Sequence, residues 1–404
     1  MALIEFPRFF KREPRPVSAE TAAPPPFASV VEALPDPLML VSADTGQSPR
    51  LVMANAAARA LFNMPKAGGP LAASLRRPEV LEAVDTALWG RIEENVVYEA
   101  GERIWRVTAT PLPQVSTPGA ERTILLLMRD ETDARRNARM RADFLANASH
   151  ELRTPLASIS GFIETLRGPA RNDAPAHDRF LRIMASQAAR MIRLVDDLLA
   201  LSRIELDEHL PPTGDYDLAQ ASTEVVEALA PLAASRNLRV TLEKDGSAPA
   251  QGSRDQLIQV TQNLIDNGLK YAPEGGEVRI RVLGPAPLDA LMSPDPRSPR
   301  TTANGGGRRA LITPELEPNQ LYVGLEVADD GMGMERTSLP RLTERFYRVE
   351  GQKSVERGGT GLGLAIVKHI VNRHRGALAV ESAPGLGTVF TVALPIAVSQ
   401  AAKD

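Results

Sequence analysis

The sequence contains no cysteine among its 404 residues. This absence excludes a disulfide-stapled scaffold, a cysteine-ligated zinc or iron–sulfur centre and thiol catalysis. An excess of charge of one sign is lacking as well, because 47 Lys and Arg residues face 50 Asp and Glu residues and leave a net charge of −3. We therefore expect no nucleic-acid binding through a globally basic surface.

Long apolar runs are also missing. No stretch of 18 apolar residues occurs, so the sequence predicts no membrane-spanning helix. The first 16 residues mix acidic and basic side chains and lack the apolar core of a signal peptide. We expect a cytoplasmic protein, and a peripheral contact of these residues with a membrane surface stays an open alternative.

Composition divides the chain into four regions. Residues 1–27 are charged and rich in proline and alanine, which is typical of a flexible lead. Residues 28–130 alternate short apolar runs with turn residues and predict an antiparallel sheet domain. Residues 131–210 are helical, and residues 211–400 show a mixed α/β pattern. Within the last region, Gly284–Asn319 is rich in Pro, Gly and Ser and predicts a mobile insertion between two strands.

The helical region carries two long patterns that flank Gly168–Pro175. Apolar residues recur at intervals of three and four from Leu145 to Leu166 and again from Leu181 to Leu198. This spacing is that of a coiled-coil-like helical hairpin. A lone two-helix hairpin cannot bury its apolar stripe, so we predict a homodimer that completes a four-helix bundle.

One of only five histidines, His150, is out of phase with this stripe. It lies two residues from each neighbouring stripe position, about 200° around the helix, so its side chain is predicted to face solvent. A neutral imidazole attacks phosphorus well if its proton is taken, and the adjacent Glu151 can take it. Thr154, one turn along, could position a water for the reverse hydrolysis, and Pro155 favours a bend. On this segment alone, an ordinary surface histidine stays open.

A second polar group lies on one face of the predicted helix Ser253–Lys270. Asn263, Asn267 and Lys270 fall within about 60° of one another at helical spacing. Amide oxygens together with phosphate oxygens suit a Mg²⁺ ion that keeps some of its waters. A solvated helix face would show the same residues, so the interpretation depends on the motifs that follow.

Two glycine-rich segments follow. Asp329 precedes Gly331 and Gly333 after a predicted strand, where a carboxylate can accept a hydrogen bond from an adenine amino group. The second run enters a predicted helix, whose N–H groups suit a triphosphate. Its candidate phosphate-binding residues are Gly359, Thr360, Gly361, Leu362, Gly363 and Leu364. The run is not a P-loop, because no Gly-Lys-Ser/Thr follows, and it lacks the leading strand of a Rossmann fingerprint.

A basic loop lies between the two glycine segments. Thr343–Arg348 places Phe346 between Arg345 and Arg348. Such a loop could act as a lid over phosphates, and a surface helix with one core phenylalanine is the alternative.

Residues from about 140 to 397 resemble the core of the sensor histidine kinases of two-component systems. Five of the family's motifs occur in order, namely Ser149–Pro155 (H box), Asn263–Tyr271 (N box), Asp329–Gly333 (first glycine box), Arg345–Arg348 (F box) and Gly359–Leu364 (second glycine box). The resemblance implies a multidomain α+β protein. A dimeric phosphoacceptor hairpin would precede an ATP-binding α/β sandwich of the type shared with Hsp90, MutL and gyrase.

The resemblance also implies roles for single residues. His150 would be the phosphoacceptor and Glu151 its acid–base partner. Asn267 would be the Mg²⁺ ligand, with Asn263 beside it.

Further residues are implied to bind ATP. Lys270 and Tyr271 would contact the nucleotide, Asp329 its adenine, and the loop from Gly333 to Gly361 would be the ATP lid. Two positions depart from the usual pattern. Gly268 replaces a small alanine at some cost in helix stability. Asp330 replaces a common asparagine and adds negative charge near the pocket.

Val30–Asn63 resembles the opening of a PAS sensor domain, through Ala33–Leu38 and Met53–Ala58. The order of domains and the hairpin sequence most resemble the phosphate-regulon-type sensor kinases, whose usual members carry N-terminal membrane spans. Residues 28–130 contain no His and no Cys, which disfavours a His-ligated haem or cysteinyl-flavin photochemistry in this domain.

From this resemblance we expect a kinase that phosphorylates His150 from Mg-ATP and passes the phosphoryl group to an aspartate of a separate response regulator. Two alternatives stay open. One is mainly a response-regulator phosphatase, to which Thr154 points, and the other is a non-kinase ATPase of the Hsp90/MutL type. The expected location is the cytoplasm or the periphery of the inner membrane.

Overall fold

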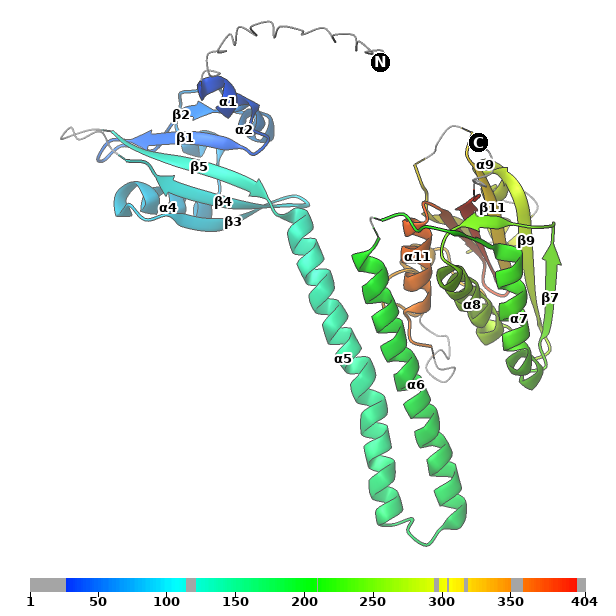
Figure 1. Ribbon diagram of the computed structural model, residues 1–404. Helices are drawn as coiled ribbons and strands as arrows, with labels where there is room; N and C mark the ends of the chain where they lie inside the picture. Colours follow the sequence, from blue (N-terminus) through cyan, green and yellow to red (C-terminus); the bar gives the residue numbers. More distant parts are fainter. Residues whose placement is uncertain are drawn as a thin grey trace, which may run out of the picture. The chain divides into compact units, whose positions relative to one another are not determined.

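The computed structural model describes residues 27–113, 121–208, 210–293, 298–303, 305–315, 319–349 and 359–397 (Figure 1). Contacts divide the chain into two units, Met1–Ala142 and Asp143–Asp404. The predicted lead 1–27 lies outside the described residues except for Phe27. In the described part of the chain, no helix is both long and apolar enough to cross a bilayer.

The first unit is a five-stranded antiparallel sheet with strand order β2-β1-β5-β4-β3. Its strands are β1 (Leu38–Ala43), β2 (Arg50–Ala54), β3 (Glu94–Ala100), β4 (Arg103–Pro111) and β5 (Arg122–Asp130). Its helices are α1 (Phe27–Ala33), α2 (Ala56–Phe62), α3 (Leu71–Ser74), α4 (Pro78–Asp85) and the π-turn η1 (Thr86–Gly90). The strands confirm the predicted sheet. Its core packs alternate strand residues such as Val41 and Leu126 against Leu71 and Val84 of the helices.

Asn55 ties the first strands of this unit together. Its side-chain oxygen accepts from the N–H of Ala58 at the start of α2 and from the N–H of Leu38, both at 3.0 Å. Its amide donates to the carbonyl of Asp36 at 2.9 Å. Asn55 is fully buried, so no water replaces these bonds.

The second unit begins within a helical hairpin of α5 (Thr132–Arg167) and α6 (Ala174–Leu206). The sequence predicts the helical region from residue 131, and α5 begins at Thr132. The first turns of α5 belong to the first unit, because the Thr132 hydroxyl accepts from the N–H of Ile104 and Arg135 pairs with Glu131. Helix α5 runs unbroken through Pro155.

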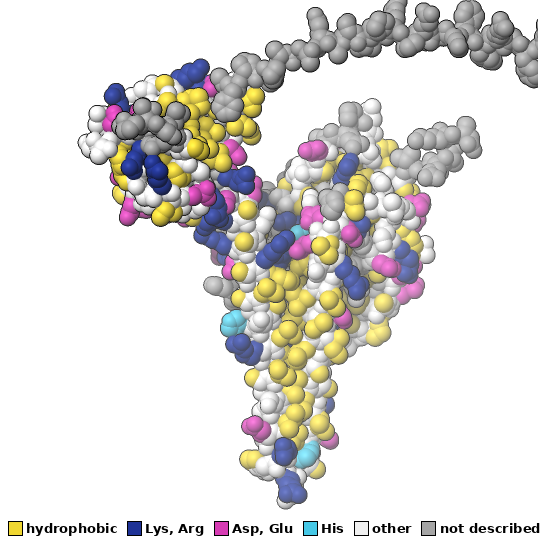
Figure 2. Space-filling view, turned by 60° about the vertical axis from the view of Figure 1, so that its left-hand side comes forward, with side chains coloured by type: hydrophobic (Ala, Val, Ile, Leu, Met, Phe, Trp, Pro, Cys, Tyr) yellow, Lys and Arg dark blue, Asp and Glu magenta, His cyan; other side chains and the backbone are white. Residues whose placement is uncertain are grey.

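The predicted stripe of the hairpin is incompletely buried. Leu145, Leu156 and Leu181 expose 65%, 57% and 52% of their surface, and Figure 2 shows hydrophobic side chains along the hairpin. A single hairpin therefore leaves its stripe open, as the spacing predicts.

The remainder of the second unit is the expected α/β domain. A six-stranded sheet has the order β10-β12-β13-β11-β9-β7, in which only β7 and β9 pair in parallel. Its strands are β7 (Arg239–Lys244), β9 (Glu277–Pro287), β10 (Gly307–Ile312), β11 (Leu321–Asp329), β12 (Ala377–Ser382) and β13 (Thr388–Pro395). A separate pair consists of β6 (Asp215–Asp217) and β8 (Pro249–Gln251).

The large sheet shares one apolar core with the helices α7 (Leu218–Ser235), α8 (Arg254–Tyr271) and α11 (Gly363–Arg373), and Leu201 and Ile204 of α6 join this core. The short helices are α9 (Leu288–Met292), α10 (Pro299–Thr302) and the 3₁₀ turn η2 (Leu339–Arg341). The result is a two-layer sandwich with α8 central among the helices (Figure 1).

The described residues of the Gly284–Asn319 segment contain secondary structure, and mobility of the segment stays a prediction. Strand β9 extends to Pro287, and β10 joins the sheet at its edge by pairing with β12. Apolar side chains of α9, among them Leu291 and Met292, pack on the outer face of the sheet. The described parts of the segment form helices and a strand because these side chains and the β10 backbone find partners that the Pro- and Gly-rich composition does not reveal.

We predict that Asn55→Ala lowers the free energy of unfolding of the first unit by about 2–3 kcal/mol, because it removes a helix cap and leaves a buried N–H unpaired. Both tryptophans of the chain, Trp89 and Trp105, lie in this unit. Urea denaturation of the full chain followed by tryptophan fluorescence measures its unfolding. The exposed Asn95→Ala is the control and should change it by less than about 0.5 kcal/mol. An equal effect of both variants would contradict the prediction.

Candidate functional site

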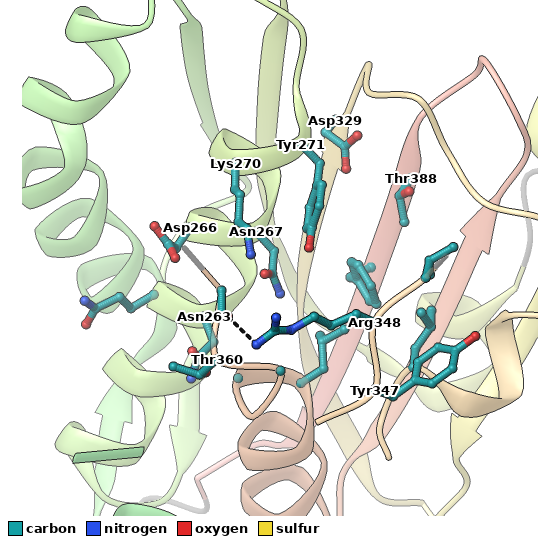
Figure 3. Close-up of a pocket in the computed structure, with 18 of the residues that line it drawn as sticks. Asn263, Asp266, Asn267, Lys270, Tyr271, Asp329, Tyr347, Arg348, Thr360 and Thr388 are labelled. Carbon is teal, nitrogen blue, oxygen red and sulfur yellow. Dashed lines mark hydrogen bonds between the residues drawn. The ribbon is translucent and has the colours of Figure 1, made fainter. Parts of the chain in front are cut away.

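Helix α8 supplies one wall of the site by presenting two different faces. Leu264, Ile265 and Leu269 are fully buried in the core, whereas Asn263, Asn267 and Lys270 are half-buried on the other face. Figure 3 shows Asn267 and Lys270 pointing into a cavity. The predicted phase of the helix is confirmed.

Close packing brings this helix onto the sheet. A Cβ added at Gly268 would lie 2.9 Å from Cγ1 of Val278 on β9, and Val278 is fully buried. The glycine departs from the alanine expected here because the strand leaves no room for a methyl group. The cost in helix propensity is therefore offset by a closer approach of α8 to the sheet.

Asp329 closes one end of the cavity at the end of β11. Only 6% of its surface is exposed, and its carboxylate accepts from the N–H of Gly331 at 2.8 Å. Burial raises the pKa of Asp329 to about 6. Gly333 has φ 63°, and a Cβ there would collide with the carbonyl of Ala383, so only glycine fits this turn. The predicted adenine-binding carboxylate is thus buried, in the cavity wall, and able to ionise near neutral pH.

Lys270 is the cation inside the cavity. Burial lowers its pKa to about 8, while Asp266 opposes this shift. Its ammonium group lies 4.9 Å from the ring centroid of Tyr271. At pH 7 the side chain still carries its charge, and a bound anion would stabilise that charge further.

The second glycine run enters α11 next to α8. A Cβ at Gly363 would lie 2.8 Å from the amide oxygen of Asn263, and one at Gly359 would lie 2.0 Å from Nζ of Lys270. The Thr360 hydroxyl accepts from the N–H of Leu362 at 3.2 Å, so the side chain braces the turn. Backbone, amide and ammonium groups therefore converge on one space, which is the arrangement that binds phosphates.

The loop with Phe346 and Arg348 forms the opposite wall. Arg348 reaches across the cavity and donates to the carbonyl of Gly359 at 2.8 Å (Figure 3). Phe346 has φ 63°, its N–H donates to the carbonyl of Gly361, and its ring lies 6.0 Å from that of Phe144. The rest of the expected lid, residues 350–358, lies outside the described residues.

Together these walls enclose a cavity of about 300 Å³. Most of the predicted binding residues line it, namely Asn263, Asn267, Lys270, Tyr271, Asp329, Gly333, Arg348, Gly359, Thr360, Gly361, Gly363 and Leu364. Gly331, Phe346 and Leu362 are not among its lining residues.

The sequence interpretation missed residues of the hairpin that line the same cavity. Arg193, Asp196 and Asp197 come from α6, and the Asp197 carboxylate accepts from the Thr360 hydroxyl at 2.7 Å. Burial raises the pKa of Asp197. No local motif marks these residues, because only docking of α6 brings them there. Thr388 was missed as well, although it follows the Gly385-Leu386-Gly387 turn.

His150 is exposed on α5, as its phase predicts. It lines a second cavity, of about 1100 Å³, together with Glu151 and the lid residues Tyr347 and Arg348. Those two lid residues also line the first cavity. His150 therefore faces a space that adjoins the first cavity.

Glu151 has partners that the sequence does not show. Its carboxylate accepts from Arg190 of α6 and from Arg348, each at 2.9 Å. The Thr154 hydroxyl donates to the carbonyl of His150 at 3.2 Å. In this arrangement Glu151 is bound to two guanidinium groups, and Thr154 is bonded to its own helix.

A divalent cation fits the α8 face better than any other part of the site. No cluster of three or more His, Cys, Asp or Glu residues suited to a metal occurs among the described residues. Asn267 and Asn263 place amide oxygens in the cavity beside the space for phosphates. Such a donor set suits Mg²⁺ held jointly with a phosphorylated ligand.

Two family models match the chain. The His Kinase A (phospho-acceptor) domain matches residues 140–207, which include His150. The histidine kinase-, DNA gyrase B- and HSP90-like ATPase matches residues 300–398, which include Asp329 and the second glycine run. Helix α8 precedes the second match, so the assignment of its residues depends on the geometry above.

Known proteins are similar over most of this chain. The phosphate regulon sensor protein PhoR of Pseudomonas aeruginosa is 36% identical over 267 residues, which cover 66% of this chain and 53% of PhoR. The sensor-like histidine kinase SenX3 of Mycolicibacterium smegmatis is 28% identical over 327 residues, 76% of each chain. A crystal structure of the histidine kinase ThkA in complex with the response regulator TrrA covers 91% of this chain and 98% of its own at 17% identity, with a TM-score of 0.45. The chain thus spans about half the length of PhoR.

We predict that Gly268→Ala destabilises α8, although alanine is the better helix former. The propensity gain is about 1 kcal/mol, whereas overpacking against Val278 costs about 1–3 kcal/mol, so the clash prevails. Hydrogen exchange of the α8 amides should become faster. The control is Gly161→Ala on α5, where a Cβ meets nothing within 4 Å. In this control, hydrogen exchange of the neighbouring α5 amides should become slower. Slower exchange in both variants would show that propensity alone decides.

Proposed function

The chain belongs to the sensor histidine kinases, and on that premise we propose that it phosphorylates His150 from Mg-ATP and transfers the phosphoryl group to an aspartate of a response regulator. The observation that carries this proposal is the adjacency of two cavities. Asn267, Lys270 and Asp329 line the first cavity, and His150 lines the second. Tyr347 and Arg348 line both cavities.

The pocket supplies the binding part of the reaction. Asp329 accepts a hydrogen bond from the adenine amino group, while Lys270, Arg348 and the N–H groups at the start of α11 neutralise the triphosphate. Phosphoryl transfer needs little covalent participation by a protein, so positioning and charge neutralisation account for most of the catalysis.

His150 supplies the nucleophile. One imidazole nitrogen forms the bond to the γ-phosphorus, the bond from that phosphorus to the β,γ-bridging oxygen breaks, and ADP leaves with the electron pair. Glu151 takes the proton from the other ring nitrogen, which keeps the phosphohistidine neutral on the ring.

Glu151 must leave Arg348 before it can serve the imidazole, because its carboxylate is now bound to that guanidinium group. Asp197 likewise occupies the Thr360 hydroxyl, and its charge would repel a triphosphate. Binding of ATP and transfer to His150 therefore require α6 and the ATPase domain to separate and dock again. Such closure steps commonly set the rate in enzymes of this kind.

Mg²⁺ would be held by Asn267, with Asn263 beside it, and would neutralise phosphate charge when bound. The remaining contributions come from the side chains named above.

The alternatives have weaker support. The Thr154 hydroxyl, which would position water in a phosphatase, bonds to the His150 carbonyl instead. A non-kinase ATPase of the Hsp90/MutL type would have no use for an exposed histidine next to the pocket. Phosphatase activity is therefore secondary to kinase activity in this proposal.

The partners follow from the surfaces. The open apolar stripe of the hairpin fits a second copy of this chain, which would complete a four-helix bundle. The exposed His150 is open to a receiver domain. A PAS-type sensor role for the first unit, phosphate-regulon-like signalling and a cytoplasmic location, with or without a peripheral contact at the inner membrane, remain predictions from the sequence.

We predict that incubation with radiolabelled ATP and Mg²⁺ labels the wild-type chain and not His150→Gln. The label should be lost in acid and persist in base, as expected of a phosphoramidate. His177→Gln removes the other described histidine of the hairpin and should label like the wild type. Acid-labile label that persists in His150→Gln would disprove the assignment.

We predict that ATP affinity falls as the pH drops below about 6. Burial raises the pKa of Asp329 to about 6, so the carboxylate that accepts the adenine hydrogen bond is lost by protonation in this range. Asp329→Asn should weaken binding at pH 7.5 about 10- to 100-fold, the value of a hydrogen bond to a charged group.

Titration calorimetry with ATP from pH 5 to 8 provides the measurement. The fall in ATP affinity below about pH 6, here called the acid limb, should vanish in Asp329→Asn. It should persist in the control Glu335→Gln, which changes an exposed carboxylate on the same loop. An unchanged acid limb in Asp329→Asn would assign it to another group.

A further inference from the structure

The inserted segment between β9 and β11 contributes a half-buried arginine that bonds to the main chain at Asp329, one of the residues that line the nucleotide pocket. Arg300 lies on α10, and only 13% of its side chain is exposed. Arg300 is not among the residues that line the cavity. It also lies outside all the motifs found in the sequence.

Its guanidinium group bridges the ends of two neighbouring strands. Nε donates to the carbonyl of Leu386 at 2.9 Å, in the turn that leads into β13. Nη2 donates to the carbonyl of Asp329 at 3.4 Å, at the end of β11. One rigid group therefore fixes the main chain at both places.

These two strand ends carry side chains that line the pocket where adenine is proposed to bind. Asp329 and Thr388 are paired residues of β11 and β13, and both line the cavity. The backbone there is tightly packed, because a Cβ at Gly387 would lie 1.9 Å from the carbonyl of Asp329. A small displacement of either strand end would change the separation of the two side chains.

Arg300 also forms an ion pair with Asp330, the residue that adds a negative charge near the pocket. Its Nη2 lies 3.9 Å from the Asp330 carboxylate, which also lies 3.7 Å from Arg279 of β9. The positive charge of Arg300 lowers the pKa of Asp329 against the effects of burial and of Asp330, and it also acts on the nearby Glu381. Position and charge at the strand end thus depend on one side chain.

We propose that Arg300 is a positioning residue of the nucleotide pocket, through which the inserted segment sets the affinity for adenine nucleotides. The proposal builds on the function proposed above, because it takes the pocket to bind ATP. Arg300 acts through Asp329 and Thr388 and touches no reacting atom. It therefore affects recognition of the base and leaves the transfer step unchanged.

The test compares full-length wild type, Arg300→Gln and Arg300→Lys by calorimetry with ATP and GTP, and by the rate of autophosphorylation. We expect Arg300→Gln to weaken ATP binding about 10-fold and to raise KM by the same factor, with kcat within about twofold. GTP lacks the amino group that Asp329 recognises, so its weaker binding should change little. The acid limb of ATP binding should move to higher pH, because Asp329 loses a neighbouring positive charge.

Arg300→Lys keeps the charge but can replace only part of the bridge, so it should restore the position of the acid limb and only part of the affinity. Arg309→Gln is the control, since Arg309 is exposed on β10 of the same segment. Unchanged ATP affinity in Arg300→Gln overturns the proposal, and so does an equal loss for ATP and GTP with kcat reduced in proportion. If the wild type binds ATP without labelling His150, the kinase proposal fails and the affinity comparison still decides the role of Arg300.

Discussion

The site depends on one constraint, which is that α8 must bury one face against the sheet and present the other to a ligand. Leu264, Ile265 and Leu269 satisfy the first requirement, and Gly268 lets the helix approach β9 closely enough for the second. Burial of three such side chains contributes several kcal/mol, at about 1.5–3 kcal/mol each, which is enough to hold half-buried polar residues in place. Asn263, Asn267 and Lys270 are therefore positioned by the core behind them.

The sequence predicts those features that depend on local periodicity. The phase of α8, the outward direction of His150 and most strands of both sheets follow from spacing alone. What it misses depends on contacts between distant segments. Glu151 and Arg348 are 197 residues apart, and no pattern near either one reveals their bond. The strand β10 escaped prediction for a related reason, because its Gly-Arg-Arg start looks like a loop until β12 pairs with it. The roles of the individual site residues stay predictions.

Polar contacts link the hairpin to the α/β domain. Carboxylates of the hairpin, Glu151 and Asp197, bind the guanidinium group of Arg348 and the hydroxyl group of Thr360, which are two of the proposed phosphate-binding groups. Arg345 pairs with Glu205 at the same seam, and His369 lies 3.0 Å from Glu208. Since these contacts are partly exposed, each contributes at most about 1 kcal/mol. These weak contacts add to the apolar packing of Leu201 and Ile204 of α6, which share the core of the α/β domain. A highly charged ligand would compete only with the polar contacts.

The helical phase of α5 has a further consequence within the second unit. Helix α5 runs without a break from Asp143 past Pro155 to Arg167, so His150 and Glu151 keep a fixed angle of about 100° around its axis. Glu151 is bonded to Arg190 of α6, whereas His150 is exposed. A rotation of α5 against α6 that draws the carboxylate away from Arg190 therefore turns the imidazole by the same angle. Release of the carboxylate and redirection of the histidine are one movement.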